Sequence, residues 1–414
     1  MGATESAAGR AETTSGESGR STSTRTVLMG AMFLMATSAV GPGFITQTTS
    51  FTVQLGAAFA FAIVISILAD IAVQMNVWRV LGVSGLRANE LANTVLPGLG
   101  WVLALLVFAG GLVFNIGNIA GTGLGANAML GLDPTLGAVI TSAFAVVIFL
   151  VKWAGAALDR VVVGLGVLMI ALMLWVAFTS NPPVGDALRN TVLPEKIDAL
   201  VITTLIGGTV GGYITYAGAH RLVDSGVTGP ENVRTITRSS VIGIIVTGVM
   251  RALLFLAILG VVAGGAVLSA DNTAASAFEH AAGQVGLRMF GIIFWAAALT
   301  SVIGASYTTV SFLTTQKVRP RVRNAMTVGF ILVCLVLFLV LGQAPQTLLI
   351  FAGAFNGVIL PLGFTVILWA AWRRRDLLQG YTYPVWLLAL GVLVWLLTIW
   401  LGVQALQGIG ELWT

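Results

Sequence analysis

Two helix-breaking stretches, Val40–Thr48 and Gly207–Thr215, interrupt long apolar segments of this sequence. Both read Val-Gly, then an optional Pro, then Gly, an aromatic residue, Ile and Thr. Because hydrocarbon cannot hydrate the backbone groups that Gly and Pro free, unwound backbone at membrane depth occurs where it lines an enclosed cavity. Ordinary glycine kinks are the alternative in a chain with 50 Gly. The paired breaks predict one shared binding site, formed by Gly41, Pro42, Gly43, Phe44, Gln47, Thr48, Gly208, Thr209, Gly211, Gly212 and Tyr213.

Hydroxyl groups gather at both breaks. Residues 46–50 follow the first, and Thr203, Thr204, Thr215 and Tyr216 flank the second. Hydroxyls and freed carbonyls suit a dehydrated Na⁺ or a polar organic ligand, and the amino-terminal ends of helices suit a carboxylate. The alternative is that these hydroxyls only bond to their own backbone or bridge helices.

Two amides and two charges lie inside other apolar runs, and we predict that they take part in coupling or gating. Asn115 and Asn118 are three apart, so they share one helical face; they either line the site or bridge helices. Asp70 and Arg251 are costly in a membrane, which favours a functional role. They could pair with each other, Arg251 could receive a substrate carboxylate, or both could snorkel to the membrane surface.

The composition is that of a polytopic membrane protein. The chain has 414 residues, of which 57% are hydrophobic and only 9% charged, against roughly 25% charged in soluble domains. Its charge of +5 falls in short blocks between apolar runs, so we predict a lipid bilayer and no nucleic acid as partner. No Walker sequence or metal-spaced Cys/His cluster appears, so we predict no enzyme and no cofactor. The single Cys334 excludes an intramolecular disulfide.

Apolar runs long enough to cross about 30 Å of hydrocarbon predict eleven spans. Residues 1–25 precede them and are polar enough to predict a disordered cytoplasmic tail. The predicted spans are 26–54, 57–79, 98–129, 135–152, 160–178, 198–223, 235–265, 287–314, 324–342, 346–371 and 384–406.

The positions of Lys and Arg predict the orientation. With the amino terminus in the cytoplasm, all but a few lie on the inner side, the outer side holding Arg189, Lys196 and Arg288. The carboxyl terminus is then outside a cell (plasma) membrane. Spans 1–5 (26–178) and 6–10 (198–371) form two halves of opposite topology, each opening with a broken helix, and 384–406 adds an eleventh span. This is the inverted repeat of the LeuT-type transporters.

The sequence resembles the Nramp family of proton-coupled divalent-metal transporters over most of spans 1–10. Residues 41–44 resemble that family's Asp-Pro-Gly-Asn, and 81–85 followed by Glu90-Leu91 resemble its turn after span 2. Residues 207–216 are similar to its Gly-Ala-Thr-Val-Met-Pro-His-Asn-Leu-Tyr, and 296–308 to its small-residue span 8. The resemblance implies transport of a divalent metal ion coupled to protons.

The sequence differs from the family at the positions that correspond to its metal ligands and to its acidic pair. The resemblance matches the family's metal-binding Asp and Asn to Gly41 and Phe44, its Met to Gly211 and its His to Tyr213. It matches the acidic pair of span 3 to the two amides at 115 and 118. Divalent metals prefer carboxylate, thioether or imidazole ligands, which these positions lack. We therefore expect a secondary transporter with H⁺ or Na⁺ coupling, either of a divalent metal (Mn or Fe type) or of a small polar or carboxylate metabolite; a membrane sensor or scaffold without turnover is the further alternative.

Overall fold

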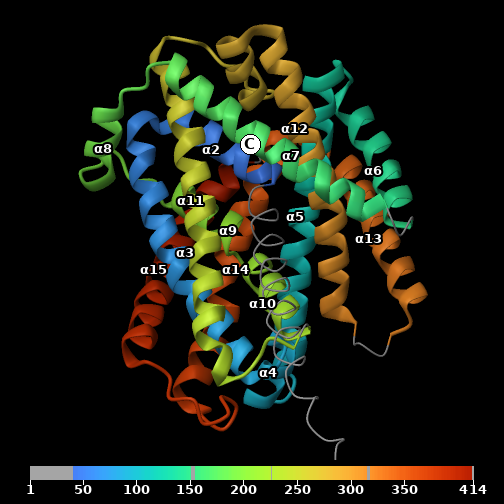
Figure 1. Ribbon diagram of the computed structural model, residues 1–414, viewed down its shortest axis with the longest axis vertical. Helices are drawn as coiled ribbons and strands as arrows, with labels where there is room; N and C mark the ends of the chain where they lie inside the picture. Colours follow the sequence, from blue (N-terminus) through green and yellow to red (C-terminus); the bar gives the residue numbers. More distant parts are fainter. Residues whose placement is uncertain (1–40, 151–153, 225, 315–317, 413–414) are drawn as a thin grey trace, which may run out of the picture.

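Apolar helices form the described chain, and Figure 1 shows most of them running along its long axis. The computed structural model describes residues 41–150, 154–224, 226–314 and 318–412; the predicted tail and residues 26–40 lie outside them. The helices are α2 (Pro42–Leu55), α3 (Phe59–Ser84), α4 (Ala88–Val95), α5 (Leu99–Leu130), α6 (Pro134–Leu150), α7 (Ala154–Thr179), α8 (Val184–Val192), α9 (Ala199–Thr209), α10 (Ile214–Asp224), α11 (Val233–Ala263), α12 (Thr273–Leu313), α13 (Pro320–Leu341), α14 (Pro345–Arg373) and α15 (Val385–Glu411), with short 3-10 turns η1 (Gly56–Ala58) and η2 (Pro230–Asn232).

Local sequence sets many of the helix ends. Pro occupies the first turn of α2, α13 and α14, where its missing N–H is not needed. Gly85 ends α3 with a φ of 67°, a left-handed conformation that glycine adopts without strain. The Asp198 carboxylate caps α9 by accepting a hydrogen bond from the Val201 N–H at 3.1 Å.

Length and composition identify eight membrane-spanning helices among the described residues, or nine if the bent pair α7 and α8 counts as one span. The prediction was eleven. The difference arises because α2 and α3 form one run of 43 residues, Pro42–Ser84, and because α6 has only 17 residues. A 43-residue helix would measure about 65 Å, twice the hydrocarbon thickness. Gly56, with a φ of 55°, divides that run into two helices.

The predicted break in the second half is confirmed. Helix α9 ends at Thr209 and α10 begins at Ile214, so the four residues between them are not helical. The freed Gly212 N–H donates to the Asn356 carbonyl of α14 at 3.1 Å. The first predicted break is only half visible, because α2 begins at Pro42 with Gly41 as its N-cap and the preceding residues lie outside the described chain.

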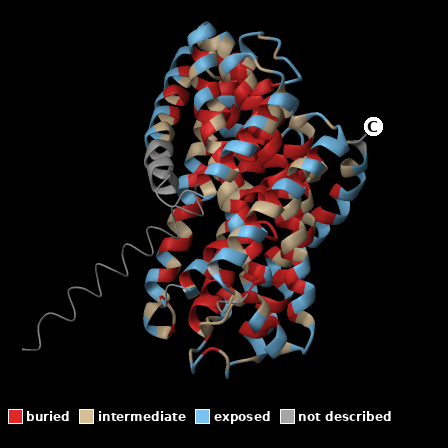
Figure 2. Ribbon diagram, turned by 90° about the vertical axis from the view of Figure 1, so that its right-hand side faces the viewer, coloured by how far each residue is buried: buried red, intermediate tan, exposed pale blue. Residues whose placement is uncertain are grey.

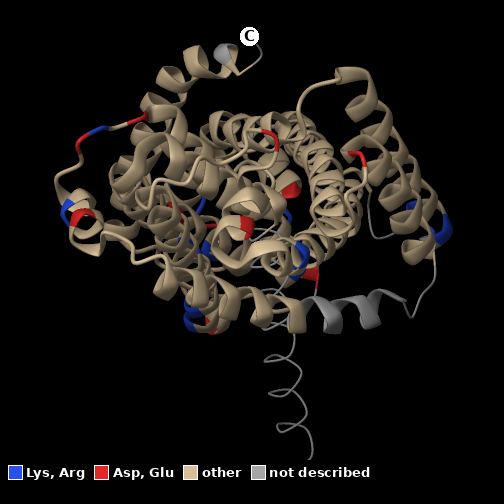
Figure 3. Ribbon diagram, turned by 90° about the horizontal axis from the view of Figure 1, so that it is seen from above, with Lys and Arg blue, Asp and Glu red and all other residues tan. Residues whose placement is uncertain are grey.

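Glycines allow the backbones of α9 and α14 to come into direct contact. A Cβ on Gly207 would fall on the Gly353 carbonyl oxygen and the Gly357 N–H, and a Cβ on Gly357 would fall on the Thr203 carbonyl. Figure 2 shows that buried residues concentrate in the interior of the bundle, and Figure 3 shows that most of the ribbon carries no charged residue. The break therefore sits in a tightly packed, mostly uncharged interior.

We expect Gly207→Ala to destabilise the bundle, because its methyl group has only backbone to displace. Overpacking of this kind costs about 1–3 kcal/mol. Thermal unfolding of the purified protein in detergent should show a lower Tm. Gly329→Ala is the matched control, since no atom lies within 4 Å of the added Cβ; an equal loss in both variants would contradict the packing argument.

Candidate functional site

Gln47 links the start of α2 to α9 and α14. Its side chain is 1% exposed, and its Nε2 donates to the Leu349 carbonyl of α14 at 3.1 Å. Its Oε1 has no hydrogen-bond partner and faces Gly208, where a Cβ would lie 2.6 Å away. The two predicted breaks are therefore next to each other, joined through one buried amide.

Arg251 of α11 lies over the first turn of α2. Its guanidinium carbon is 4.6 Å from the centroid of the Phe44 ring, and the residue is 2% exposed. Its Nε and Nη2 have no hydrogen-bond partner. Leaving donors of a buried cation unpaired is costly, so this guanidinium is poised for an anionic group.

Asp70 of α3 is the second buried charged residue near the breaks, and we call Gln47, Asp70 and Arg251 together the centre. Asp70 is 1% exposed and interacts with the Thr209 hydroxyl and with the charge of Arg251, while its Oδ1 has no hydrogen-bond partner. The two charges do not form the direct pair considered from the sequence, because the ion pairs within 4 Å in the described chain lie elsewhere. Their burial also argues against snorkelling.

Four of the hydroxyls at the breaks are occupied within their own helices, whereas those of Ser50, Thr203 and Tyr216 have no hydrogen-bond partner. Thr48 donates to the Phe44 carbonyl at 2.7 Å, and Thr209 donates to the Leu205 carbonyl at 2.9 Å. Thr49 and Thr204 bond back in the same way, at 2.9 and 2.7 Å. This supports the structural alternative for these four threonines.

Tyr213 stands in the gap between α9 and α10. Its hydroxyl donates to the Ala305 carbonyl of α12 at 3.3 Å, and its ring centroid is 6.0 Å from that of Phe114 on α5. The neighbouring Gly212 packs on Ile359 of α14. The aromatic residue of the break thus contacts α5 and α12, and the glycine before it contacts α14.

The two amides of α5 differ in their surroundings. Asn115 donates to the Ser306 hydroxyl of α12 at 2.9 Å, as an interhelical bridge would. Asn118 is 1% exposed and its Nδ2 has no partner. One turn further, Gly121 contacts Pro42 at the start of α2. Of the two, Asn118 is the better candidate for a lining residue.

Sequence reasoning missed Asn356. Its Nδ2 donates to the carbonyls of Gly110 and Ala352, at 3.1 and 2.9 Å, and its carbonyl receives the Gly212 N–H. Its Oδ1 has no partner. The available signal was an amide in the middle of an apolar span, flanked by glycines at 353 and 357.

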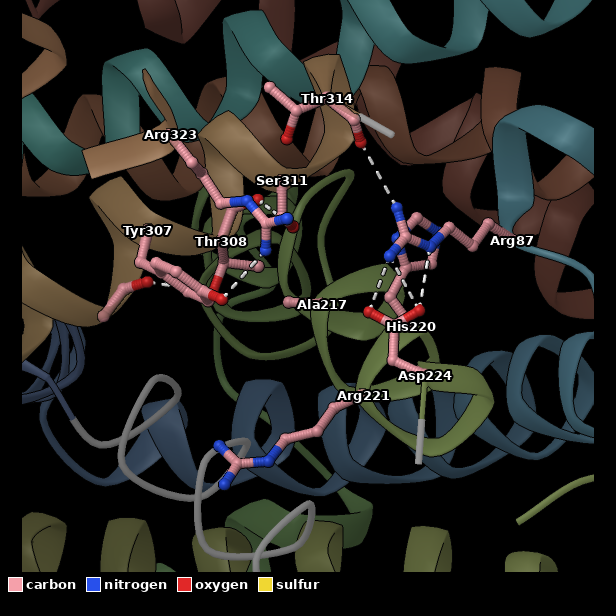
Figure 4. A pocket seen from close by; sticks show the side chains of 11 residues that line it. Arg87, Ala217, His220, Arg221, Asp224, Tyr307, Thr308, Ser311, Thr314 and Arg323 are labelled. Atoms are coloured by element: carbon pink, nitrogen blue, oxygen red, sulfur yellow. Dashed lines mark hydrogen bonds and ion pairs between the residues drawn. The ribbon is translucent and has the colours of Figure 1, made fainter. Parts of the chain in front are cut away.

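Residues of α10 and α12 line a cavity of about 390 Å³ (Figure 4), which we call the arginine vestibule. Gly304 and Thr308 line it on either side of the Ala305 carbonyl that binds Tyr213. Helix α12 therefore contributes both to the vestibule and to the contact with Tyr213. The lining residues are Arg87, Ala217, His220, Arg221, Asp224, Gly304, Tyr307, Thr308, Ser311, Thr314 and Arg323.

An ion pair ties the vestibule walls together. Arg87 donates to both carboxylate oxygens of Asp224 on α10, at 2.9 and 2.8 Å, and to the Thr314 carbonyl after α12 at 3.4 Å. His220 accepts the Ala88 N–H on Nε2 at 3.0 Å and leaves a buried Nδ1 without a partner. The sequence alone assigns no site role to Arg87 or His220, since neither belongs to a recognisable motif.

Comparison with known proteins identifies the family. Residues 32–407 match the family model for natural resistance-associated macrophage protein-like (Nramp) proteins. The chain belongs to the Nramp family. It is 49% identical over 399 residues to the uncharacterized membrane protein YcsG of Bacillus subtilis (strain 168), covering 96% of this chain and 98% of that protein.

Two solved structures share the fold. A mutant of the Eremococcus coleocola manganese transporter superposes with a TM-score of 0.72 at 16% identity, covering 94% of this chain and 88% of that one. MhsT in complex with L-phenylalanine superposes with a TM-score of 0.66 at 15% identity, covering 92% and 98%. The predicted LeuT-type fold and the Nramp resemblance are confirmed, and the chain is a multi-pass membrane transporter-family protein.

The arginine vestibule should favour anions over cations. The test uses Ser311→Cys in a Cys334→Ala background, so that the new thiol is the single cysteine. We expect it to react roughly tenfold faster with the anionic reagent sulfonatoethyl methanethiosulfonate than with its cationic trimethylammonium analogue. Both rates are first corrected for the rates of the reagents with a free thiol. Adding Arg221→Gln and Arg323→Gln should abolish most of that preference. Equal corrected rates in the parent variant would refute the electrostatic assignment.

Proposed function

We propose that this Nramp-family protein is a secondary transporter working by alternating access, and that its centre binds a small solute carrying a carboxylate. The observation that carries the proposal is Arg251, a buried guanidinium over the Phe44 ring with two unpaired nitrogens. A guanidinium binds a carboxylate through two parallel hydrogen bonds. Gln47 Oε1 and Asn118 Nδ2, also buried and unpaired, supply an acceptor and a donor for the rest of the solute.

The second candidate is a divalent metal ion of the Mn or Fe type, and family membership favours it. Against it stands the donor set. No group of three or more His, Cys, Asp or Glu able to hold a metal occurs in the parts of the chain that the structure describes. By the family resemblance, the usual ligand positions fall on Gly41, Phe44, Gly211 and Tyr213. Backbone carbonyls and an amide oxygen are weak ligands for Mn²⁺ or Fe²⁺ without a carboxylate.

The arginine vestibule supports the same choice. Three of its lining residues are arginines and one is a carboxylate. A unit charge 4 Å from one such group interacts with it by about 1 kcal/mol in water and about 4 kcal/mol near a protein surface. An anion would be drawn toward the centre by this field and a divalent cation repelled.

Asp70 is our candidate for the coupling-ion site. Its Oδ1 is unpaired, and its side chain lies near Thr209, the last residue of α9, where helix carbonyls give a partial negative charge. A carboxylate at such an end suits H⁺ or Na⁺. We also infer from the Lys and Arg distribution that the vestibule faces the cytoplasm of a cell membrane, with the carboxyl terminus outside.

A thermal-shift screen of the purified protein tests the substrate class. A ligand that binds only the folded state raises its stability by RT ln(1 + [L]/Kd). We expect a shift with small carboxylates, and no saturable shift with micromolar Mn²⁺ or Fe²⁺. A metal-dependent shift that survives without any carboxylate would favour the second candidate, and counterflow in proteoliposomes would separate transport from a sensing role.

Variants at the two central charges should separate their roles. We expect Arg251→Gln and Asp70→Asn each to abolish uptake while membrane insertion stays normal, because each removes a charge that nothing else at the centre supplies. If the guanidinium receives the carboxylate, the double variant stays inactive. Recovery in the double variant would instead indicate mutual compensation.

Arg288→Gln and Asp186→Asn are the matched controls for that measurement. Arg288 donates to the Ala128 carbonyl at 3.1 Å, and Asp186 lies in the first turn of α8. Both should retain uptake. Full uptake by Arg251→Gln and by Asp70→Asn would contradict the assignment of the centre.

A further inference from the structure

An apolar groove runs between α14 and α15 on the outside of the bundle. It has a volume of about 650 Å³. Trp369, Trp372 and Val385 are 46%, 57% and 79% exposed, so it opens outward. We call it the tryptophan groove, and it is lined by Thr365, Leu368, Trp369, Trp372, Val385, Leu388, Ala389, Val392 and Trp395.

The walls of the tryptophan groove are held in place by the protein itself. The Trp395 Nε1 donates to the Thr365 hydroxyl at 2.9 Å and to the Pro361 carbonyl at 3.3 Å. The rings of Trp369 and Trp372 meet edge to face, with centroids 5.6 Å apart. The Trp395 N–H is thus already used, and the groove offers a preformed apolar surface.

One end of the groove is cationic. Helix α14 ends in Arg373, whose guanidinium carbon lies 4.9 Å from the centroid of the Trp372 ring. The next residue, Arg374, is paired with Asp376 at 2.9 Å. Arg373 and Arg375 have no ion-pair partner within 4 Å among the described residues. Two unneutralised guanidiniums therefore lie where the apolar walls end.

We propose that the tryptophan groove binds one anionic phospholipid, with an acyl chain along the indoles and the phosphate at Arg373 and Arg375. Basic residues beside a transmembrane groove are the feature that recognises anionic headgroups, and arginine pairs with phosphate through its planar fork. The nearly all-apolar lining excludes a polar solute. A second copy of this chain would bring a second Arg373–Arg375 cluster to the same place, which like-charge repulsion disfavours.

Native mass spectrometry of the purified full chain, titrated with phosphatidylglycerol or phosphatidylcholine of the same acyl composition, tests the proposal. We expect a first bound phosphatidylglycerol that is tighter than phosphatidylcholine, and Arg373→Gln with Arg375→Gln to weaken it roughly 10- to 30-fold. Arg319→Gln with Arg321→Gln, an exposed basic pair on α13 and the turn before it, is the control and should change little. Equal weakening in the control would overturn the site.

A second pair of variants tests the apolar half. Trp369→Leu with Trp372→Leu should weaken the first phosphatidylglycerol, whereas Trp400→Leu, at another exposed tryptophan of α15, should not. Arg373→Lys with Arg375→Lys keeps the charge and should retain most of the binding, so a loss from misfolding would be recognised. A photoactivatable phosphatidylglycerol should label residues 365–395. Labelling elsewhere, or a dimer whose contact covers this groove, would refute the proposal.

Discussion

The interior of this bundle depends on satisfying a short piece of unwound backbone without water. Between α9 and α14, bare glycine surfaces bring the two backbones into contact, and the Asn356 carbonyl accepts the Gly212 N–H at 3.1 Å. Hydrocarbon would offer no partner for such an N–H. The close approach explains why glycines line both sides of the crossing, and the backbone carbonyl of residue 356 is the acceptor that it brings to the Gly212 N–H.

Around the crossing of α9 and α14, several polar groups remain unpaired. Gln47 Oε1, Asp70 Oδ1, Asn118 Nδ2 and two nitrogens of Arg251 are buried without hydrogen-bond partners. Groups of this kind are uncommon in native interiors, and each calls for an explanation. Their gathering around the two breaks fits a site that is complete only when ligand is present. The same groups would make the empty protein less stable than its packing suggests.

The sequence predicted the fold class and the second break well because both rest on strong signals, long apolar runs and a dense glycine cluster. Gln47 and Gly208, which the sequence predicted for one site, lie next to each other, and their role in binding stays a prediction. The sequence did not reveal Asn356, His220 or the Arg87–Asp224 pair at 2.8 Å, since these depend on contacts between residues far apart in the chain. The span count differed because composition cannot locate the turn that Gly56 makes. For the threonines at the breaks, residue type alone could not tell a free hydroxyl from one that is bonded to its own helix.

Pro361 lies inside α14 and interrupts the backbone hydrogen bonding of that helix. Proline has no N–H, so the carbonyl one turn earlier, on Gly357, loses its usual partner. That turn is the one that packs on α9 and receives the Gly212 N–H. Helix α15 supports the following turn from outside, through Trp395 and the Pro361 carbonyl at 3.3 Å. Helix α14 is therefore supported by α9 and α15 around the place where its backbone hydrogen bonding is interrupted, and a chain cut before α15 would expose the turn at Pro361 to lipid.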